Sequence, residues 1–277
     1  MIKKNSYLRA LKKISASLRE VQNPELFRSV NRIINKPSDY SDFDLAYALD
    51  TADLTKAIPA NVTSFIRTHY LRAAENDEER RGLAYNNLGS LYYNGRTGRK
   101  DYSKAIHYYT LADENGYRLA TENLAFCYYY GCGTPIDYEK AYYYFSKAAL
   151  SDRYEAMYML GDMFRYGHYV EKDPDMVRRS YIKAEQMMRY NNEAIGTRTG
   201  SVYKRLGDMY YEGIGVDIDY DKAYECYQRA ERGYYDQVRY GDQYNKSSQH
   251  QVQERLAELR NKIRENLPKL EWAENGH

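Results

Sequence analysis

The sequence gives no sign of disulfide chemistry, membrane insertion or secretion. Three cysteines in 277 residues are an odd number without the paired spacing of a disulfide framework. No apolar run approaches the roughly 18 residues that a membrane span requires. The basic first residues are not followed by the apolar core of a signal peptide. We therefore expect a cytoplasmic protein with no membrane span.

Patterns of catalytic or metal-binding residues are also missing. The five histidines are scattered, and Cys127 and Cys132 have neither a second cysteine pair nor a histidine at zinc-ligand spacing. No nucleophile and base can be paired. The glycines around Cys132 lack the strand context and the Lys-Ser/Thr of a phosphate-binding loop. We predict no enzymatic activity, no metal site and no cofactor.

Aromatic residues are unevenly used. The chain has one tryptophan and six phenylalanines against 34 tyrosines. Some tyrosines are explained by the repeat described below, but others, such as Tyr93, Tyr129 and Tyr211, lie beside the repeated positions. These tyrosines need an explanation of their own, either packing or binding.

Charge is unevenly distributed too. Residues 1–36 hold nine lysines and arginines against two glutamates, which leaves the rest of the chain mildly acidic because the total net charge is +2. An acidic array argues against a nucleic-acid groove. The basic N-terminal arm itself stays open to an acidic partner.

Four stretches of the chain share one set of residues. Copies one to three follow at a period of 36 residues, and copy four follows 46 residues after copy three. A fixed period in this range is typical of solenoid proteins. The shared positions in copy one are Ala84, Leu88, Gly89, Tyr92, Gly95, Asp101, Ala105, Tyr109 and Ala112.

Each copy has the pattern of a helical hairpin. In copy two, Ala120, Leu124 and Tyr128 recur at the spacing of one helix face. Gly131 then ends that helix, and Asp137 is expected to cap a second helix. Gly116 and Gly233 are expected to end the second helices of copies one and four. One hairpin cannot bury its apolar face alone, so the hairpins must stack.

The repeated pattern resembles the Sel-1-like repeat, a relative of the tetratricopeptide repeat. The resemblance covers about residues 84–234 and is clearest over 202–234. It departs from the family where copy three has Met176 and Val177 in place of Lys-Ala and lacks the second turn glycine after Gly167. The resemblance implies an all-α, right-handed α-α superhelix of antiparallel hairpins, tetratricopeptide-like, in a family whose shared property is scaffolding of protein complexes.

The flanks of the repeats are expected to cap the solenoid. Apolar residues recur at helical spacing from Tyr7 to Val21 and from Val252 to Leu267, with Pro268 ending the last helix. Self-association or docking through the N-terminal arm remain alternatives. We expect a basic N-terminal helical cap at 1–40, a divergent first repeat at 41–82, repeats at 83–119 and 120–155, a divergent repeat with an insertion at 156–200, a repeat at 201–236 and a C-terminal capping helix at 237–277.

The first helix of each hairpin carries a second stripe, on the side opposite its core residues. In tetratricopeptide-like arrays this side lines the concave groove, and a row of tyrosines with mixed charge suits a peptide-binding groove. Packing between adjacent hairpins is the alternative role for these side chains. The candidate groove residues are Asn86, Ser90, Tyr93, Glu122, Phe126, Tyr129, Tyr158, Asp162, Arg165, Lys204, Asp208 and Tyr211.

We therefore predict a non-enzymatic scaffold, adaptor or regulator that binds a protein or peptide partner in this groove. One alternative is binding of nucleic acid or an anionic surface through residues 1–36, although nucleic acid is not the expected partner of the array. An immunity-type inhibitor of a toxin is a second alternative. The polar insertion at 189–200 is either functional or a neutral loop, and the sequence does not indicate an oligomeric state.

Overall fold

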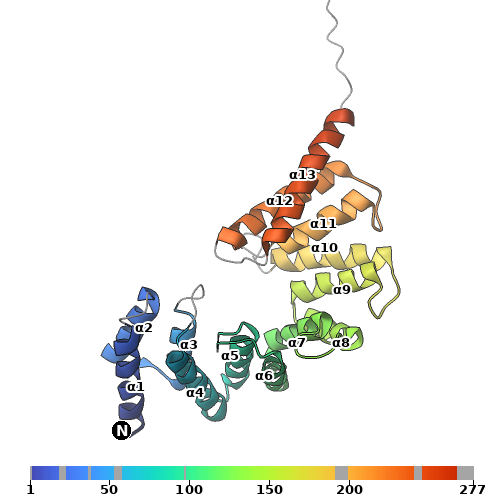
Figure 1. Ribbon diagram of the computed structural model, residues 1–277. Helices are drawn as coiled ribbons and strands as arrows, with labels where there is room; N and C mark the ends of the chain where they lie inside the picture. Colours follow the sequence, from blue (N-terminus) through green and yellow to red (C-terminus); the bar gives the residue numbers. More distant parts are fainter. Residues whose placement is uncertain are drawn as a thin grey trace, which may run out of the picture. The chain divides into compact units, whose positions relative to one another are not determined.

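A computed structural model describes residues 2–18, 23–36, 39–52, 58–96, 98–190, 199–239 and 245–266 (Figure 1). Within these ranges the regular structure is helical, without strands. The helices are α1 (Ile2–Leu18), α2 (Pro24–Asn35), α3 (Asp42–Asp50), α4 (Ala60–Asn76), α5 (Arg81–Tyr93), α6 (Tyr102–Glu114), α7 (Arg118–Tyr130), α8 (Tyr138–Ala149), α9 (Tyr154–Tyr166), α10 (Pro174–Tyr190), α11 (Gly200–Glu212), α12 (Tyr220–Arg239) and α13 (Lys246–Asn266).

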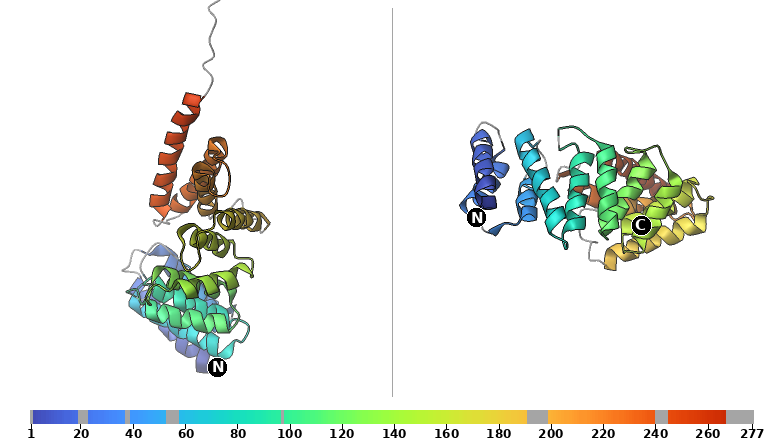
Figure 2. Two further views of the ribbon diagram at one scale, coloured as in Figure 1. Left: turned by 90° about the vertical axis from the view of Figure 1, so that its right-hand side faces the viewer. Right: turned by 90° about the horizontal axis from the view of Figure 1, so that it is seen from below.

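The chain divides into two compact units, residues 1–148 and residues 149–277. In unit 1, successive helices pack as antiparallel neighbours, and Figure 2 shows them side by side when seen from below. In unit 2, α9 packs on α10, α11 on α12, and α12 on α13. Each unit is thus a stack of helical hairpins, and the predicted all-α superhelix of tetratricopeptide-like hairpins is confirmed.

The predicted helix ends are confirmed by their hydrogen bonds. The carboxylate of Asp101 caps α6 by accepting from the Lys104 amide at 3.0 Å, and Asp137 and Asp219 do the same for α8 and α12 at 2.9 Å. At the other end of the first helices, Gly131 adopts a φ of +69°, as Gly167 and Gly213 do in their copies. These turns place the second helix of each hairpin against the first.

Helix glycines allow an aromatic ring to lie directly on the first helix. A Cβ at Gly207 would lie 2.7 Å from the ring of Tyr227, and one at Gly161 would lie 2.6 Å from the ring of Tyr181. Such distances are shorter than van der Waals contact, so a larger residue would force the hairpin apart. Copy two has Ala125 at this position and a phenylalanine as the ring.

Two positions, 233 and 169, depart from the glycine pattern of the repeats. Gly233 does not end its helix, because α12 continues to Arg239. A Cβ there would lie 2.5 Å from the Gly200 backbone nitrogen, so Gly233 instead lets α12 approach the start of α11. In copy three, Tyr169 stands where copies two and four have a turn glycine, and it adopts the same left-handed backbone, with a φ of +67°.

Each flanking helix buries apolar side chains within its own unit. In α1, Leu11, Ile14 and Leu18 are buried, and in α13 Val252 and Leu259 are buried. Most of the remaining described side chains of both helices are exposed or partly exposed, and their role as caps stays a prediction. Residues 191–198 of the predicted insertion, residues 19–22 and residues 267–277, which include Pro268, lie outside the described residues.

Candidate partner-binding site

The predicted second stripe is not a row of freely exposed side chains. In unit 1, Asn86 and Glu122 are buried. The ring of Tyr93 packs edge-on against Tyr102 at 5.2 Å between centroids, and that of Tyr129 packs against Tyr138 at 5.4 Å. These two rings thus pack within their own hairpins, whereas the alternative considered from the sequence was packing between adjacent hairpins; their role in binding stays a prediction.

The middle position of the stripe pairs with the aromatic residue of the second helix, 19 residues later. Asp162 accepts a hydrogen bond from the Tyr181 hydroxyl at 2.6 Å, and Asp208 accepts one from Tyr227 at 2.7 Å. Where the ring has no hydroxyl, in Phe145, the partner is the apolar Phe126, with ring centroids 5.2 Å apart. A buried hydroxyl needs a hydrogen-bond partner and a phenyl ring does not, so the two positions are chemically matched.

The pair in copy one is also matched, but it joins two neutral hydroxyls and has no carboxylate acceptor. The hydroxyls of Ser90 and Tyr109 lie 3.3 Å apart. Burial raises the pKa of Tyr109, and in copy four burial followed by the charge of Asp208 raises the pKa of Tyr227. The phenols thus stay protonated and remain donors at physiological pH.

A buried ion pair joins copies three and four. The Arg205 guanidinium of α11 donates from Nε to both carboxylate oxygens of Asp162 at 2.9 Å and from Nη2 at 2.5 Å. Its carbon lies 4.0 Å from the centroid of the Tyr158 ring, a cation–π contact. Tyr158 and Asp162 are both buried, so they hold the repeats together rather than facing a partner.

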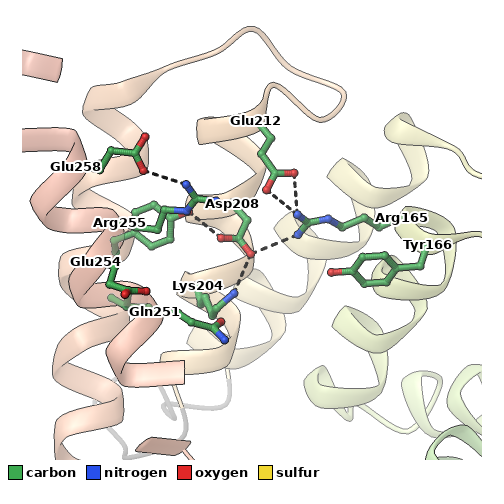
Figure 3. Close-up of a pocket in the computed structure, with 11 residues that line it drawn as sticks. Arg165, Tyr166, Lys204, Asp208, Glu212, Gln251, Glu254, Arg255 and Glu258 are labelled. Atoms are coloured by element: carbon green, nitrogen blue, oxygen red, sulfur yellow. Dashed lines mark hydrogen bonds and ion pairs between the residues drawn. The ribbon is translucent and has the colours of Figure 1, made fainter. Parts of the chain in front are cut away.

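Three further stripe residues of unit 2, Arg165, Lys204 and Asp208, line a pocket of about 430 Å³ (Figure 3). We call it the polar pocket. It lies between the first helices α9 and α11 and the capping helix α13, over a floor formed by Tyr227 of α12. Its lining residues are Arg165, Tyr166, Lys204, Asp208, Glu212, Tyr227, Gln251, Val252, Glu254, Arg255 and Glu258.

Asp208 accepts hydrogen bonds from three side chains that line the polar pocket. Besides Tyr227, its carboxylate accepts from Lys204 Nζ at 3.0 Å and from Arg165 Nη1 at 3.3 Å. Arg165 also forms a two-pronged ion pair with Glu212, at 2.7 and 2.8 Å (Figure 3). A guanidinium that is paired with two carboxylates can adopt few side-chain conformations, so this side of the pocket is preorganised for binding.

The α13 side of the polar pocket is anchored through Tyr211. Its hydroxyl donates to Glu258, which also accepts from Arg255 at 3.0 Å. Lys262 donates to the Tyr211 hydroxyl at 2.9 Å and pairs with Glu258 at 3.1 Å. Hydrogen bonds from Tyr211 and Lys262 lower the pKa of Glu258 to about 2, so this carboxylate is ionised at physiological pH.

A second cavity, of about 420 Å³, adjoins the polar pocket. We call it the neighbouring cavity. Arg165, Tyr166 and Glu212 line both spaces, so the Arg165–Glu212 ion pair stands between them. The neighbouring cavity has more apolar walls, contributed by Phe164, Pro174, Val177 and Ile214 at the ends of α9 and α11 and the start of α10.

The structure thus brings Arg165, Lys204 and Asp208 of the predicted stripe to one pocket. Their role in binding stays a prediction. The analysis of the sequence missed Gln251, Glu254, Arg255 and Glu258, because α13 was interpreted only as a cap. The last three lie three, four and seven positions after Gln251, so the four residues form a polar helix face beside the buried one, and that signal was available.

The described residues include no group of three or more histidine, cysteine or acidic side chains that could hold a metal ion. Cys127 is buried, and burial raises the pKa of its thiol to about 12, which removes it as a nucleophile. None of the helices within the described ranges has the length and apolar character needed to cross a bilayer.

Comparison with known proteins agrees with the hairpin architecture. The Sel1 repeat family matches residues 82–117, 118–152, 155–176 and 203–233. An uncharacterized Sel1-like repeat-containing protein of Schizosaccharomyces pombe is 32% identical over 76 residues, 27% of this chain. That match spans 11% of the relative's length.

Solved structures also resemble this chain. A Sel1 repeat protein from Oxalobacter formigenes has a TM-score of 0.55 at 21% identity, over 79% of this chain and 84% of that one. A protective antigen of uropathogenic Escherichia coli strains, described as displaying an SLR fold, has a TM-score of 0.49 at 22% identity, over 84% of this chain and 57% of that one. The first of these similarities shows the fold.

Proposed function

Because this chain is a Sel1-repeat protein, we propose that it is a non-enzymatic scaffold whose polar pocket binds a segment of a partner protein. The observation that supports this most directly is the pocket itself. Four helices of unit 2, α9, α11, α12 and α13, line about 430 Å³ of space, mostly with charged and aromatic side chains. Stacked hairpins do not need such a space for their own stability.

The polar pocket is suited to a peptide segment because it is prearranged. Its cations are already paired with its carboxylates, so binding would cost little side-chain entropy. Tyr166 is 51% exposed at its edge and offers a large contact area with a polar tip. An adaptor, a regulator and an immunity-type inhibitor of a toxin would all use such a site, and the identity of the partner decides among them.

Capture from the native cell with matched variants tests this proposal. Tyr93, Tyr129 and Tyr211 are poor probes, because their packing would be lost on substitution. We would instead compare the wild type with a Tyr166→Ala/Glu254→Ala variant, whose side chains are both largely exposed. A Tyr235→Ala/Glu225→Ala variant of α12 removes similar exposed groups outside the pocket.

We expect the pocket variant to lose at least one partner that the wild type and the α12 variant retain. Far-ultraviolet circular dichroism and thermal unfolding would first establish that all three proteins are folded alike. A folded pocket variant that retains every partner would overturn the proposal.

A second candidate function uses the basic N-terminal arm. Arg9, Lys12 and Lys13 of α1 are exposed while the apolar residues between them are buried. Deleting the arm would uncover the core, so an Arg9→Gln/Lys12→Gln/Lys13→Gln variant is the better test. If the arm binds polyanions, a 20-base-pair DNA duplex should bind the wild type more tightly than the variant, with a steep fall in affinity as salt rises. Equal, salt-independent binding would exclude this function.

A further inference from the structure

The charges of the polar pocket indicate the chemistry of what it binds. We infer that the polar pocket and the neighbouring cavity together bind a partner segment in which an arginine or lysine is adjacent to an apolar residue. This inference rests on the proposed function and specifies the ligand of the same site. The basic residue would occupy the polar pocket, and the apolar residue would occupy the neighbouring cavity.

The cations of the polar pocket are already engaged. Lys204 pairs with Asp208 at 3.0 Å, Arg165 pairs with Asp208 and Glu212, and Arg255 pairs with Glu258 at 3.0 Å. An incoming anion would have to displace a carboxylate from each of them. It would also approach four carboxylates in a small space, which is electrostatically unfavourable.

Asp208 is buried, but the side chains of Glu254 and Glu212 are more exposed than those of Arg165 and Lys204. The Glu254 side chain is 65% exposed and lies 3.4 Å from His250 on the helix surface. The Glu212 side chain is 39% exposed, against 14% for its partner Arg165. An incoming guanidinium or ammonium group would therefore meet the oxygen atoms of Glu254 and Glu212 first, and the oxygens of these two carboxylates can accept further hydrogen bonds.

Tyr166 supports the same preference. Its half-exposed ring lines both spaces, and its face already lies near a cation, with the Arg165 guanidinium carbon 5.4 Å from the ring centroid. Tyrosine faces attract guanidinium and ammonium groups. The ring can therefore contact an incoming basic side chain while its other edge faces the neighbouring cavity.

The neighbouring cavity accounts for the second half of the ligand. Val177, Ile214 and the ring of Phe164 contribute apolar walls, and Pro174 contributes a rigid one. A side chain of leucine, isoleucine or phenylalanine would bury apolar surface there, which favours binding. Because the two spaces share one wall, neighbouring residues of one extended segment can reach both.

Selection from a random peptide library tests this inference without assuming a partner. A phage-displayed heptapeptide library would be selected against the full chain. We expect enrichment of peptides with arginine or lysine next to leucine, isoleucine or phenylalanine. Enriched peptides that are acidic, or that lack a basic residue, would overturn the inference and leave the proposed function standing. Failure to enrich any peptide would count against the proposed function itself.

Variants then locate the binding. A selected peptide should bind Glu254→Gln about fivefold more weakly than the wild type, which is the scale of one exposed ion pair. Tyr166→Ala should weaken binding by about tenfold, because the ring serves both spaces. Glu225→Gln and Tyr235→Ala, on α12 outside the pocket, should leave affinity unchanged. Equal loss in the pocket and α12 variants would place the peptide elsewhere and overturn the inference.

Discussion

A single hydroxyl group sets the polarity of the residue opposite it in each hairpin. Asp162 and Asp208 face tyrosines, whereas Phe126 faces a phenylalanine. A charged acceptor strengthens such a hydrogen bond, and a buried carboxylate that loses its donor is costly. The two positions therefore act as one unit, although they are 19 residues apart.

The first prediction concerns that hydroxyl. Tyr227→Phe removes the donor to the buried Asp208 and should lower the free energy of unfolding by about 1.5–3 kcal/mol. Tyr109→Phe is the matched control, since its hydroxyl lies 3.3 Å from a neutral serine, and it should cost about 1 kcal/mol or less. Urea denaturation of both variants measures the difference. Equal costs would show that the carboxylate gains nothing from the phenol.

The second prediction concerns the glycine beneath the same ring. In an open helix, Gly→Ala stabilises by about 1 kcal/mol. In Gly207→Ala, however, the new Cβ would lie 2.7 Å from the Tyr227 ring, so a net loss of about 1–3 kcal/mol is expected. Thermal and urea unfolding would measure this loss. A variant as stable as the wild type would mean that the ring moves aside freely.

At the scale of the helix, hydrogen-bonded caps determine where elements begin and end. The repeated aspartates and glycines predicted these ends correctly, because caps depend on local geometry that a single residue can specify. The prediction that Gly233 ends its helix was wrong, because its role depends on a contact between distant residues and not on local geometry. A glycine is needed there because α12 approaches Gly200, a residue distant in the chain. The residues around Gly233 in the sequence do not indicate that contact.

The third prediction follows from the caps. Hydrogen bonds from Lys222, through its side chain and its backbone amide, lower the pKa of Asp219. A depressed pKa in the folded state means that the cap stabilises fully above about pH 4 and loses this effect as the pH falls further. Asp219→Asn keeps a capping oxygen without the charge. Its thermal midpoint should therefore fall less than that of the wild type between pH 6 and pH 3.

Thermal unfolding followed by circular dichroism at several pH values would test this. Asp219→Ala, which removes the cap altogether, serves as the control and should be less stable than Asp219→Asn at every pH. If the wild type and Asp219→Asn lose stability in parallel on acidification, the charge of Asp219 does not contribute.

For the whole molecule, the period predicted the architecture, but the pocket could not be derived from it. Periodicity shows which face of a helix is opposite its buried face. It does not show which side chains of the next hairpin cover that face. Arg205 covers Asp162 from the following repeat, which turned a predicted binding residue into a packing residue. The contribution of α13 was missed for a similar reason, since it lies outside the repeated region and has no counterpart copy.

The fourth prediction concerns the independence of the two units. In repeat proteins, stability spreads mainly between neighbours. Leu259→Ala in α13 removes a fully buried side chain and should cost about 2–5 kcal/mol in unit 2. Hydrogen exchange should then speed up in α12 and α13 and stay unchanged in α3 and α4.

Leu26→Ala, in the buried face of α2, is the reciprocal control. It should speed exchange in α1 and α2 and leave α12 and α13 unaffected. Mass spectrometry of both variants would resolve these segments. Faster exchange throughout the chain after either substitution would mean that the units unfold together.

The ion pair between Asp162 and Arg205 has a consequence for how such a chain can evolve. Asp162 needs an arginine from the copy that follows it, whereas Asn86 of copy one accepts from Asn123 of copy two at 3.0 Å. These two junctions are thus complementary in different ways. Duplicating, deleting or exchanging one copy would set a buried charge against an unsuitable neighbour, so the order of the copies in this gene is chemically constrained.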